Sequence, residues 1–529
     1  MTKDTHDHYT RRDVLKRGAA AGAVALGSGA FLASPRAGYA SADEESSQHP
    51  KRGGNLRIGV TGGSTSDSID AGMYISQVSG LMIYQLYDSL YAFDKNARPQ
   101  LSLAKEVEHN KDASVWTVRL RDGVTFHNGK DVTAEDVAYT FRRILNPKKP
   151  LIGAVFIKKM DLKGIKILDK HTLRIPFHVP FAQFPEVQAT YFYFIVPSVG
   201  YNPKAPIGSG PFEFRSFTPG QQATFVRNPH YWQSQFPYVD QVVITDFADE
   251  TSQLNALSSG QIDLAASLSG SSIPLVKAAG GTAQIADGMF YAPLAMRMDV
   301  APFNDIRVRQ ALRLVVDRKQ MRDLVFSGHG IIGNDIFGYY EPTYDHALPQ
   351  REVDVAEARK LLRRAGHTKL NITFIAADVA AGALRGAQIF AQQAAAAGVT
   401  VNIKQVPVST LFGPNYLHWH FFQDLWAYNP YVLNVENDLL PGGIFNGCHA
   451  NYPPYTKLWG KLTRTVNPSE QKDIAHEMQR MEWDGHASGN IIPYFIPTID
   501  GIGKGVFGLT PSKTGNYLGG FDLKTVWLG

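Results

Sequence analysis

Residues 412–431 are rich in aromatic side chains, and they have the clearest capacity for binding chemistry in the sequence. Eight of these twenty positions are aromatic: Phe412, Tyr416, Trp419, Phe421, Phe422, Trp426, Tyr428 and Tyr431. Aromatic rings in a cleft can stack on a flat ligand or hold a cation against the ring face. The same residue types also fill hydrophobic cores, so the run predicts a binding surface for some of these rings and a packed interior for the others.

Metal and thiol chemistry have weaker signals. His418-Trp419-His420 would place two imidazoles on one side of a strand, which is the beginning of a metal site. No convincing third ligand accompanies them, so we expect no bound metal. The single cysteine, Cys448, matches no nucleophile motif and cannot form an internal disulfide. We expect it to be a small buried side chain.

Catalytic motifs are missing from the sequence. It contains no Gly-x-Ser-x-Gly and no His-Glu-x-x-His, since His476-Glu477 is followed by Met478, Gln479 and Arg480. We therefore expect a protein that is not an enzyme and has no cofactor. A secreted hydrolase stays as an alternative, because carboxylates are plentiful and a sequence does not show which of them face each other.

The first 40 residues have the layout of an export signal. Paired Arg11 and Arg12 precede a mildly apolar run over 19–33, and small residues suit cleavage after Ala40 or Ala42. The arginine pair resembles a twin-arginine signal. No cysteine lies near the cleavage site, so we expect a periplasmic protein that is soluble rather than lipid-anchored. Residues 41–53 are polar and should form a disordered mature N-terminus.

The composition describes a large, nearly neutral globular chain. Its 529 residues exceed what one hydrophobic core supports, so several domains are expected. The net charge is +5, and the six basic and three acidic side chains of residues 1–40 account for three of these charges. Nothing in this balance indicates a nucleic-acid surface.

Hydrophobic periodicity and capping residues predict a mixed α/β fold. Strands are expected at 56–60, 115–120, 172–175 and 491–499. Helices are expected at 76–90, from Thr133, from Thr251, from Asn304 to Gly328 as the longest of all, from Asp354 and at 469–486. Residues 370–375, 383–397 and 399–406 read as a strand–helix–strand unit, long enough for a parallel crossover.

Seven sequence blocks, collinear over about 53–500, resemble the peptide-, nickel- and opine-binding class of bacterial periplasmic solute-binding proteins. They are Gly53-Gly54-Asn55-Leu56, Tyr84-Gln85-Leu86-Tyr87-Asp88-Ser89-Leu90, Trp116 to Lys130 running into Thr133-Ala134-Glu135-Asp136-Val137, Gly208-Ser209-Gly210-Pro211-Phe212, Arg227-Asn228-Pro229-His230-Tyr231-Trp232, Ala256 to Asp263, and Phe303 to Leu312. We interpret these motifs as scaffold and not as ligand contacts.

This resemblance implies two lobes around a cleft, an extra small domain, and closure on a ligand by hinge motion. The expected segments are 54–88, 206–290 and 499–529 for lobe I, 89–205 for the small α/β domain and 291–498 for lobe II. The implied partners are a small-molecule or peptide ligand and the permease and ATPase subunits of an ABC importer. We expect the protein to act as a monomer.

The resemblance also indicates where the ligand pocket lies, and this sequence differs there from the family pattern at one point. Peptide binders of this class commonly hold the peptide amino terminus with an Asp shortly after a Trp, but here Trp426 is followed by Tyr428 and Asn429. An amide accepts a hydrogen bond without neutralising an ammonium group. A peptide-like ligand is therefore expected alongside alternatives: an opine, a cationic or aromatic compound, or a nickel chelate.

The predicted ligand-binding residues form a short set. Trp426, Tyr428 and Asn429 come first, and Trp419 and Tyr74 are added as aromatic residues. The turn Thr61-Gly62-Gly63-Ser64 follows the first strand and could offer backbone N–H groups, so Gly63 and Ser64 complete the set.

Overall fold

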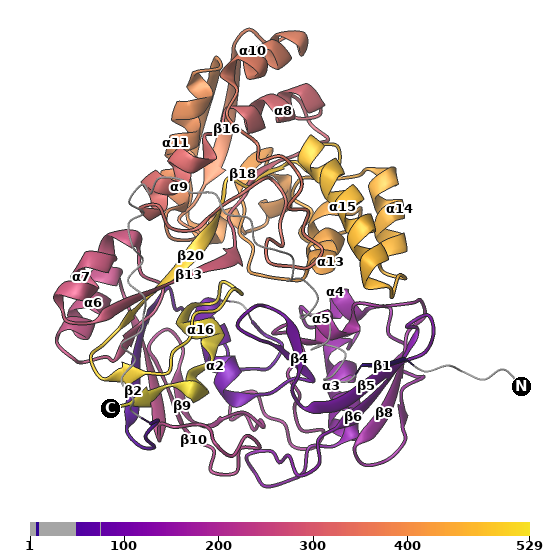
Figure 1. Cartoon of the computed structure of the whole chain (residues 1–529), viewed down its shortest axis with the longest axis vertical. Helices are drawn as coiled ribbons and strands as arrows, with labels where there is room; N and C mark the ends of the chain where they lie inside the picture. The colour runs from indigo at the N-terminus through magenta and orange to yellow at the C-terminus, as the bar shows by residue number, and fades with distance from the viewer. Residues whose placement is uncertain (1–6, 10–48, 75) are drawn as a thin grey trace, which may run out of the picture.

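Three sheets of five or more strands organise the molecule. The computed structural model describes residues 7–9, 49–74 and 76–529 (Figure 1). The predicted cleavage sites at Ala40 and Ala42, and most of the segment 41–53, lie outside the described residues. Of the predicted leader only strand β1 (Asp7–Tyr9) is described, paired antiparallel with β5 at a sheet edge.

The eight-stranded sheet, with the helices on its faces, is called lobe I. Its strands are β13 (Thr282–Phe290), β20 (Tyr494–Ile502), β12 (Leu264–Ala265), β2 (Asn55–Thr61), β11 (Gln241–Phe247), β10 (Gln222–Arg227) and β9 (Phe212–Thr218), with β15 (Ile331–Ile332) added to β20. The predicted first strand is confirmed as β2, whose Leu56, Ile58 and Val60 are buried. The helices of lobe I are α2 (Gln77–Leu86), α6 (Glu250–Ser258), α7 (Ile273–Ala278) and α16 (Tyr517–Phe521).

A five-stranded sheet with its helices is called the small domain. Its strands, in order, are β1, β5 (Ala104–His109), β6 (Val115–Leu120), β8 (Thr172–Pro176) and β7 (Lys166–Ile167), and its helices are α3 (Ala134–Ile144), α4 (Ala154–Ile157) and α5 (Phe184–Gln188). The predicted start of α3 is confirmed, since the Thr133 N–H donates to the Asp136 carboxylate at 2.8 Å. The hairpin of β3 (Tyr91–Phe93) and β4 (Pro99–Leu101) lies between this domain and α2 (Figure 1).

The remaining five-stranded sheet and its helices are called lobe II. The strand order is β17 (Val399–Gln405), β16 (Leu370–Ala376), β18 (Phe421–Gln423), β14 (Leu294–Met296) and β19 (Asn490–Ile491). Its helices include α8 (Ile306–Leu314), α9 (Arg318–Phe326), α10 (Val355–Arg364), α11 (Ala383–Ala395), α13 (Tyr431–Asn434), α14 (Pro453–Leu462) and α15 (Pro468–Asp484). The predicted parallel crossover is confirmed by the parallel pairing of β16 with β17 on either side of α11.

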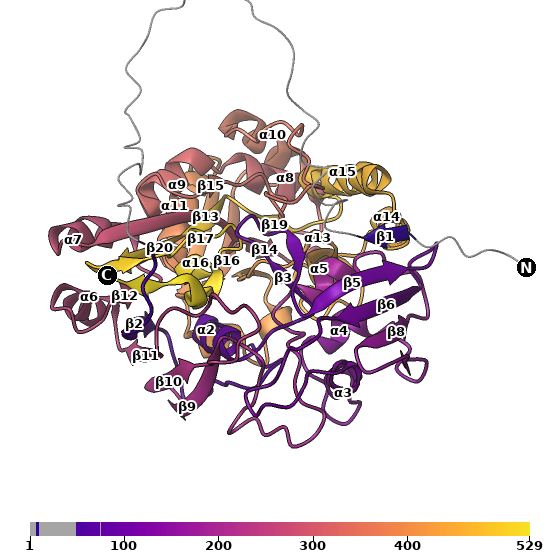
Figure 2. The same cartoon turned by 60° about the horizontal axis from the view of Figure 1, so that its bottom comes forward.

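Two paired strands join the lobes. β13 and β20 run antiparallel from the sheet of lobe I toward lobe II, where the chain continues into β14 and returns from β19 (Figures 1 and 2). Their register shifts between Ala286 and Phe290, at the end that approaches lobe II. The chain therefore passes between lobes I and II along a strand pair.

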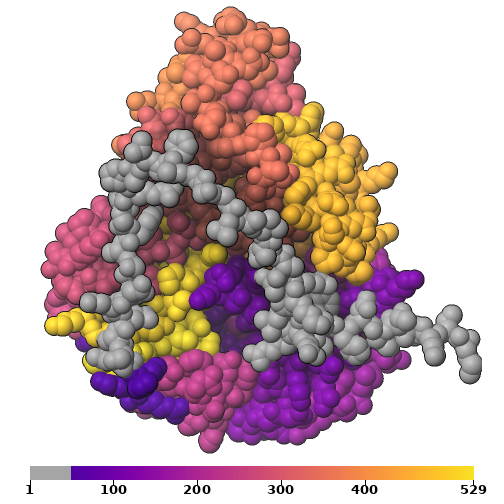
Figure 3. All heavy atoms as spheres, viewed as in Figure 1, coloured from indigo at the N-terminus to yellow at the C-terminus, as the bar shows by residue number. Residues whose placement is uncertain are grey.

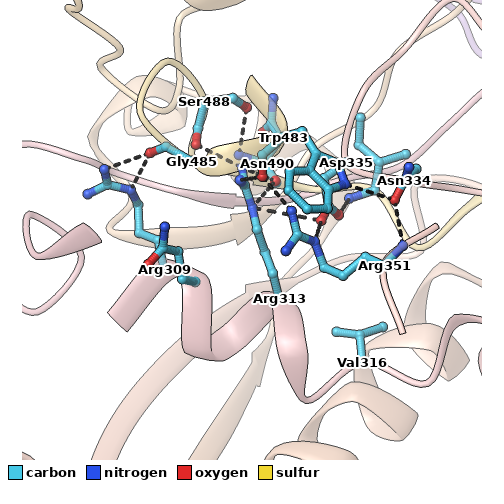
Figure 4. A network of polar contacts seen from close by, with 12 residues as sticks. Arg309, Arg313, Val316, Asn334, Asp335, Arg351, Trp483, Gly485, Ser488 and Asn490 are labelled. Atoms are coloured by element: carbon cyan, nitrogen blue, oxygen red, sulfur yellow. Dashed lines mark hydrogen bonds and ion pairs between the residues drawn. The ribbon is translucent and has the colours of Figure 1, made fainter. Parts of the chain in front are cut away.

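A buried ionic network holds together part of lobe II. The Asp335 carboxylate accepts two hydrogen bonds from Arg318, at 2.7 and 2.8 Å, and one from Arg351 at 2.9 Å. Arg313 lies 3.9 Å from the same carboxylate and donates to the carbonyls of Ser488 and Asn490 (Figure 4). Because Asp335 and Arg313 have no exposed side-chain surface, their charges depend on one another and on these carbonyls.

The longest predicted helix is wrong. Residues 304–328 form two helices, α8 and α9, because Asp317 caps the second one by accepting the N–H of Gln320 at 2.8 Å. The longest helix among the described residues is α15, with 17 residues. The hydrophobic stripe continues through the break, since Val315 and Val316 are buried there.

Two smaller boundaries also differ from prediction. The predicted strand at 491–499 is interrupted at Pro493, which has no N–H for a ladder, and β20 begins at the next residue. Helix α6 begins at Glu250 because Asp249, and not Thr251, provides the cap. In the part of the chain that the structure describes, no helix combines the length and apolar character needed to cross a bilayer.

Candidate ligand-binding site

The segment after β18 brings lobe II into contact with the rest of the molecule. Tyr428 is buried, and its ring meets Phe93 of β3 edge-on at 5.2 Å. Its hydroxyl donates to the carbonyl of Ala97 at 3.5 Å, and Met289 packs against it. Tyr428 therefore lies at a boundary between lobe II and the β3–β4 hairpin, with its ring packed among protein groups, and its role in ligand binding stays a prediction.

Asn429 continues this contact toward the small domain and lobe I. The Tyr191 hydroxyl donates to the Asn429 side-chain oxygen at 3.4 Å. The ring of Tyr191 stacks on Tyr74, with 3.9 Å between centroids and 25° between planes. Burial raises the pKa of the Tyr191 phenol, which keeps the hydroxyl protonated and able to donate. Tyr74, Tyr191 and Asn429 thus form a line across all three parts, and Tyr191 is the member that the sequence analysis missed.

Two carboxylates belong to the same region, and the sequence analysis missed both. Glu341 of lobe II accepts the backbone N–H of Tyr431 on both oxygens, at 2.9 and 3.0 Å. Burial raises its pKa to about 8, the Tyr431 N–H opposes this rise, and the charge of Glu186 adds to it. Burial raises the pKa of Glu186, on α5, to about 7. The sequence gives no signal for either residue, because it does not show whether the carboxylate of a glutamate is buried or exposed.

A cavity of about 460 Å³ shares one residue, Phe93, with these contacts, and no described residue of lobe II is among those that line it. Tyr84 of α2, Phe93 of β3 and the segment 510–525 contribute to its wall. The hairpin β3–β4 and the C-terminal segment, yellow in Figure 3, meet at the centre of the face below lobe II. The volume falls within the range of about 300–1,000 Å³ typical of small-molecule pockets.

A second contact closes the other side of the boundary between the small domain and lobe II. The N–H of Ala182 donates to the Thr463 carbonyl at 3.1 Å, and the Gln183 amide donates to the Leu462 carbonyl at 3.1 Å. Lys159 lies 4.2 Å from the centroid of the Trp459 ring. The small domain and lobe II therefore touch both here and at the Tyr191–Asn429 contact.

Trp426 has the contacts of a core residue. It is buried, its ring meets Phe445 edge-on at 5.9 Å, and its indole N–H donates to Asp424 at 3.1 Å. Burial raises the pKa of Asp424 to about 6, although hydrogen bonds from Leu425, Tyr416 and Trp426 lower it. Asp424 therefore faces into lobe II and organises the segment from which Tyr428 and Asn429 project.

The other predicted binding residues lie apart from this contact. Trp419 packs against a small core cluster of lobe II and donates its indole N–H to the Leu411 carbonyl at 3.0 Å. The N–H groups of Gly63 and Ser64 donate to Asp246 at 3.0 Å and Asp67 at 2.8 Å. These two backbone donors already have protein acceptors, so they are not free to bind a ligand.

The metal and thiol candidates have structural surroundings. The expectation that His418 and His420 share one strand is wrong, because His418 ends a 3₁₀ turn and His420 precedes β18. Among the described residues, no group of three or more His, Cys, Asp or Glu side chains is arranged to hold a metal ion. Cys448 is fully buried, as predicted, and its thiol lies 3.2 Å from the Asn490 side-chain oxygen.

The family model of the bacterial extracellular solute-binding proteins, family 5 (middle region), matches residues 98–438, more than half of the chain. The chain belongs to this family. The nickel-binding periplasmic protein of Escherichia coli is 29% identical over 54% of this chain and 56% of the relative, and the E. coli oligopeptide-binding protein OppA is 27% identical over 54% and 58%. The chain thus spans less than two thirds of the length of these two relatives.

Another relative aligns along nearly the whole chain. The probable peptide ABC transporter periplasmic-binding protein y4tO of Sinorhizobium fredii is 25% identical over 98% of both chains. The names of these three relatives describe periplasmic binding proteins, and that of y4tO assigns it to a probable peptide ABC transporter.

Solved structures show the fold. AgaA of Agrobacterium tumefaciens R10, in complex with agropinic acid, superposes with a TM-score of 0.77 at 22% identity, over 90% of this chain and 99% of that one. DppA of Helicobacter pylori, in complex with the peptide STSA, gives 0.77 at 19% identity, over 90% and 98%. The predicted class, a mixed α/β two-lobed periplasmic binding protein fold, is confirmed.

Proposed function

We propose that this protein captures a small solute between lobe II and the opposite parts of the molecule, and delivers it to the permease and ATPase of an ABC importer. The line from Tyr74 through Tyr191 to Asn429 carries this proposal, because a ligand that interacts with these residues would join all three parts. A ligand that stabilises the closed arrangement shifts the population toward it. The protein acts as a monomer without catalysis or cofactor.

A peptide or peptide-like solute is the proposed ligand class, since several relatives are named as peptide-binding proteins. A non-peptide solute, such as an opine, a cationic or aromatic compound or a nickel chelate, is the alternative. Two proteins similar to this one support the alternative: AgaA, solved with agropinic acid, and the nickel-binding relative.

The proposed ligand contacts are Tyr74, Tyr428 and Asn429 from the sequence prediction, together with Tyr191. Trp426 supports Tyr428 and Asn429 through its bond to Asp424. Trp419, Gly63 and Ser64 are left out of the proposed site, because their N–H donors are bonded within the protein.

Ligand binding is expected to be 1:1 and to make the protein more compact. Mass spectrometry under native conditions should identify a solute that co-purifies with protein lacking residues 1–42. Small-angle scattering should show a smaller radius of gyration when that solute is added back. Scattering curves that do not change with a verified ligand would contradict closure.

Asn429→Ala should weaken ligand binding. Among the described residues, the Asn429 side chain makes the only hydrogen bond to the Tyr191 hydroxyl across this contact, and the alanine removes it.

We also propose export to the periplasm by the twin-arginine route, without a lipid anchor. Replacing Arg11 and Arg12 together by lysine should keep the full-length chain in the cytoplasm, because the route depends on the arginine pair. Fractionation and immunoblotting check the location. Arg17→Lys, in the same leader, is the matched control and should be exported. Normal export of the double variant would remove the twin-arginine assignment and leave the binding function untouched.

A further inference from the structure

The cavity beside the β3–β4 hairpin is separate from the contact that carries the proposed function. Most of its wall comes from the end of α2 with the hairpin after it, the segment 231–233 and the C-terminal segment 510–525. None of the described residues of lobe II lines it. A molecule held there would therefore contact lobe I and the hairpin, and it would not join lobe I to lobe II.

Four polar side chains of this wall have groups that are not satisfied within the protein. The hydroxyls of Tyr84 and Ser102 and the side-chain amide of Asn516 make no hydrogen bond to any described residue. Ser102 and Asn516 belong to buried residues, with 9% and 7% of their surface exposed. The side-chain oxygen of Gln233 is buried without a partner as well. Because buried polar groups are normally hydrogen-bonded, four such groups around one cavity indicate that something else partners them there.

The charged side chains of the wall, in contrast, are already engaged. The buried Asp88 carboxylate accepts hydrogen bonds from three side chains, at 3.1, 3.1 and 3.2 Å. Lys524 donates to Asp522 at 2.5 Å, and Asp94 accepts two backbone N–H groups of its own turn at 2.8 and 2.9 Å. Lys95 is exposed, so water hydrates its ammonium group. The groups that remain free inside the cavity are therefore uncharged, and together they both donate and accept hydrogen bonds.

Aromatic rings form the apolar part of the wall. The Tyr84 ring meets Phe194 and Phe521 edge-on, with 5.1 and 5.3 Å between centroids, and Phe93 contributes a further ring. Burial raises the pKa of the Tyr84 phenol, which keeps its hydroxyl protonated and able to donate. Small-molecule pockets commonly combine apolar and aromatic walls with a few polar groups that fix orientation, and this cavity has that composition.

An unusual turn holds Phe521 at the cavity. Residues 518–521 all have positive φ angles, of 50°, 66°, 80° and 68°. The Leu518 N–H donates to the Asp500 carboxylate at 2.6 Å, and the Gln85 amide donates to the Phe521 carbonyl at 3.0 Å. The left-handed conformation is unfavourable for Leu518 and Phe521, which are not glycine, so these two buried bonds are needed to keep it. The wall is therefore fixed in shape before any molecule enters.

We propose that this cavity is a second binding site, which takes an uncharged ring molecule carrying hydroxyl or amide groups, such as a monosaccharide. The hydroxyl or amide groups satisfy Tyr84, Ser102, Gln233 and Asn516, and an apolar face of the ring packs against the aromatic side chains. A charged molecule would lose hydration on entry, while the buried charge of the wall is already compensated. The site is independent of the solute that binds between the lobes.

The test compares ring molecules that differ in charge. Calorimetric titration of the protein lacking residues 1–42 would use methyl glucoside, methyl galactoside and myo-inositol as neutral probes, and glucuronate and glucosamine as charged ones. At least one neutral probe should bind with 1:1 stoichiometry, and the charged sugars should bind at least about tenfold more weakly. Asn429→Ala should bind the neutral probe as the wild type does, because Asn429 does not line the cavity.

Two variants place the bound probe in the cavity. Tyr84→Phe and Asn516→Ala should each weaken binding by about two- to tenfold, as expected for the loss of a hydrogen bond between uncharged groups. Thermal unfolding of ligand-free Tyr84→Phe should match that of the wild type, because the lost hydroxyl has no partner among the described residues. Tyr238→Phe is the matched control, since this lobe I hydroxyl also makes no hydrogen bond to a described residue but lies outside the cavity wall. Its affinity should equal that of the wild type.

Three results would overturn the second site. Failure of all three neutral probes to bind would show that water alone fills the cavity and partners its polar groups. Binding that neither Tyr84→Phe nor Asn516→Ala weakens would place the probe elsewhere on the molecule. Equal affinity for the charged sugars would contradict the assignment of an uncharged ligand. Each of these results leaves ligand capture between the lobes untouched, because that function is tested with the co-purified solute.

Discussion

Replacing Asp335 with asparagine is expected to lower the free energy of unfolding by about 3–5 kcal/mol, the range found when one partner of a buried ion pair is removed. Asp335 accepts hydrogen bonds from Arg318 and Arg351, and Arg313 lies 3.9 Å away. The asparagine would leave three buried or nearly buried guanidinium groups without a counter-charge. Urea unfolding followed by circular dichroism measures the loss.

The control for this variant is Asp323→Asn. Asp323 also pairs with two cations, Lys319 and Arg322, but on the surface, where water and salt screen the charges. It should unfold nearly as the wild type does. Equal unfolding midpoints for the two variants would show that the buried network stabilises lobe II no more than the surface ion pairs of Asp323 do.

The same network predicts how stability responds to acid. Burial opposes the ionisation of Asp335, but the charges of Arg318, Arg313 and Arg351 outweigh it and hold its pKa below the usual value. A carboxyl whose pKa is lowered by folding contributes stability above its unfolded pKa of about 4. This contribution is lost as the pH falls through the lower folded pKa, and the asparagine variant should lack that part of the acid dependence.

The sequence predicts elements well where helix caps and side-chain periodicity agree. Thr133 and Asp354 begin α3 and α10 as expected, and β2 and β6 follow the alternation of buried residues. The prediction fails at 304–328, because an apolar stripe continues through Val315 and Val316 while the backbone stops and restarts at Asp317. Periodicity reports which face is buried and does not by itself report a break in the hydrogen-bond ladder.

The binding site is predictable only in part, for a different reason. The family pattern points to the segment 426–429, and the structure places Tyr428 and Asn429 at the lobe contact. Their partners come from distant parts of the chain: Tyr191 follows α5, and Glu341 lies in a lobe II loop. Local sequence cannot show that these residues converge, because convergence is a property of tertiary packing.

Variants of Trp426 test whether this ring binds the ligand directly or only supports the binding residues from the hydrophobic core of lobe II. Trp426→Ala should lower the free energy of unfolding by about 3–5 kcal/mol, the usual loss when a buried tryptophan is replaced by alanine. The ring packs against Phe445, and its loss leaves a cavity and removes one of three donors to Asp424. Trp426→Phe keeps most of the ring and removes only the donor, so it should cost less, about 1–3 kcal/mol.

Stability and affinity together separate the two roles of Trp426. If the ring acts through the core, Trp426→Phe should bind the co-purified solute nearly as the wild type does, at a temperature where both are folded. Trp426→Ala should then lose affinity in proportion to the disorder of the segment that carries Tyr428 and Asn429. A ring that stacks on the ligand also loses affinity in Trp426→Ala, but without a large loss of stability. Chemical denaturation paired with calorimetric titration distinguishes them, and the contacts with Phe445 and Asp424 favour the first result.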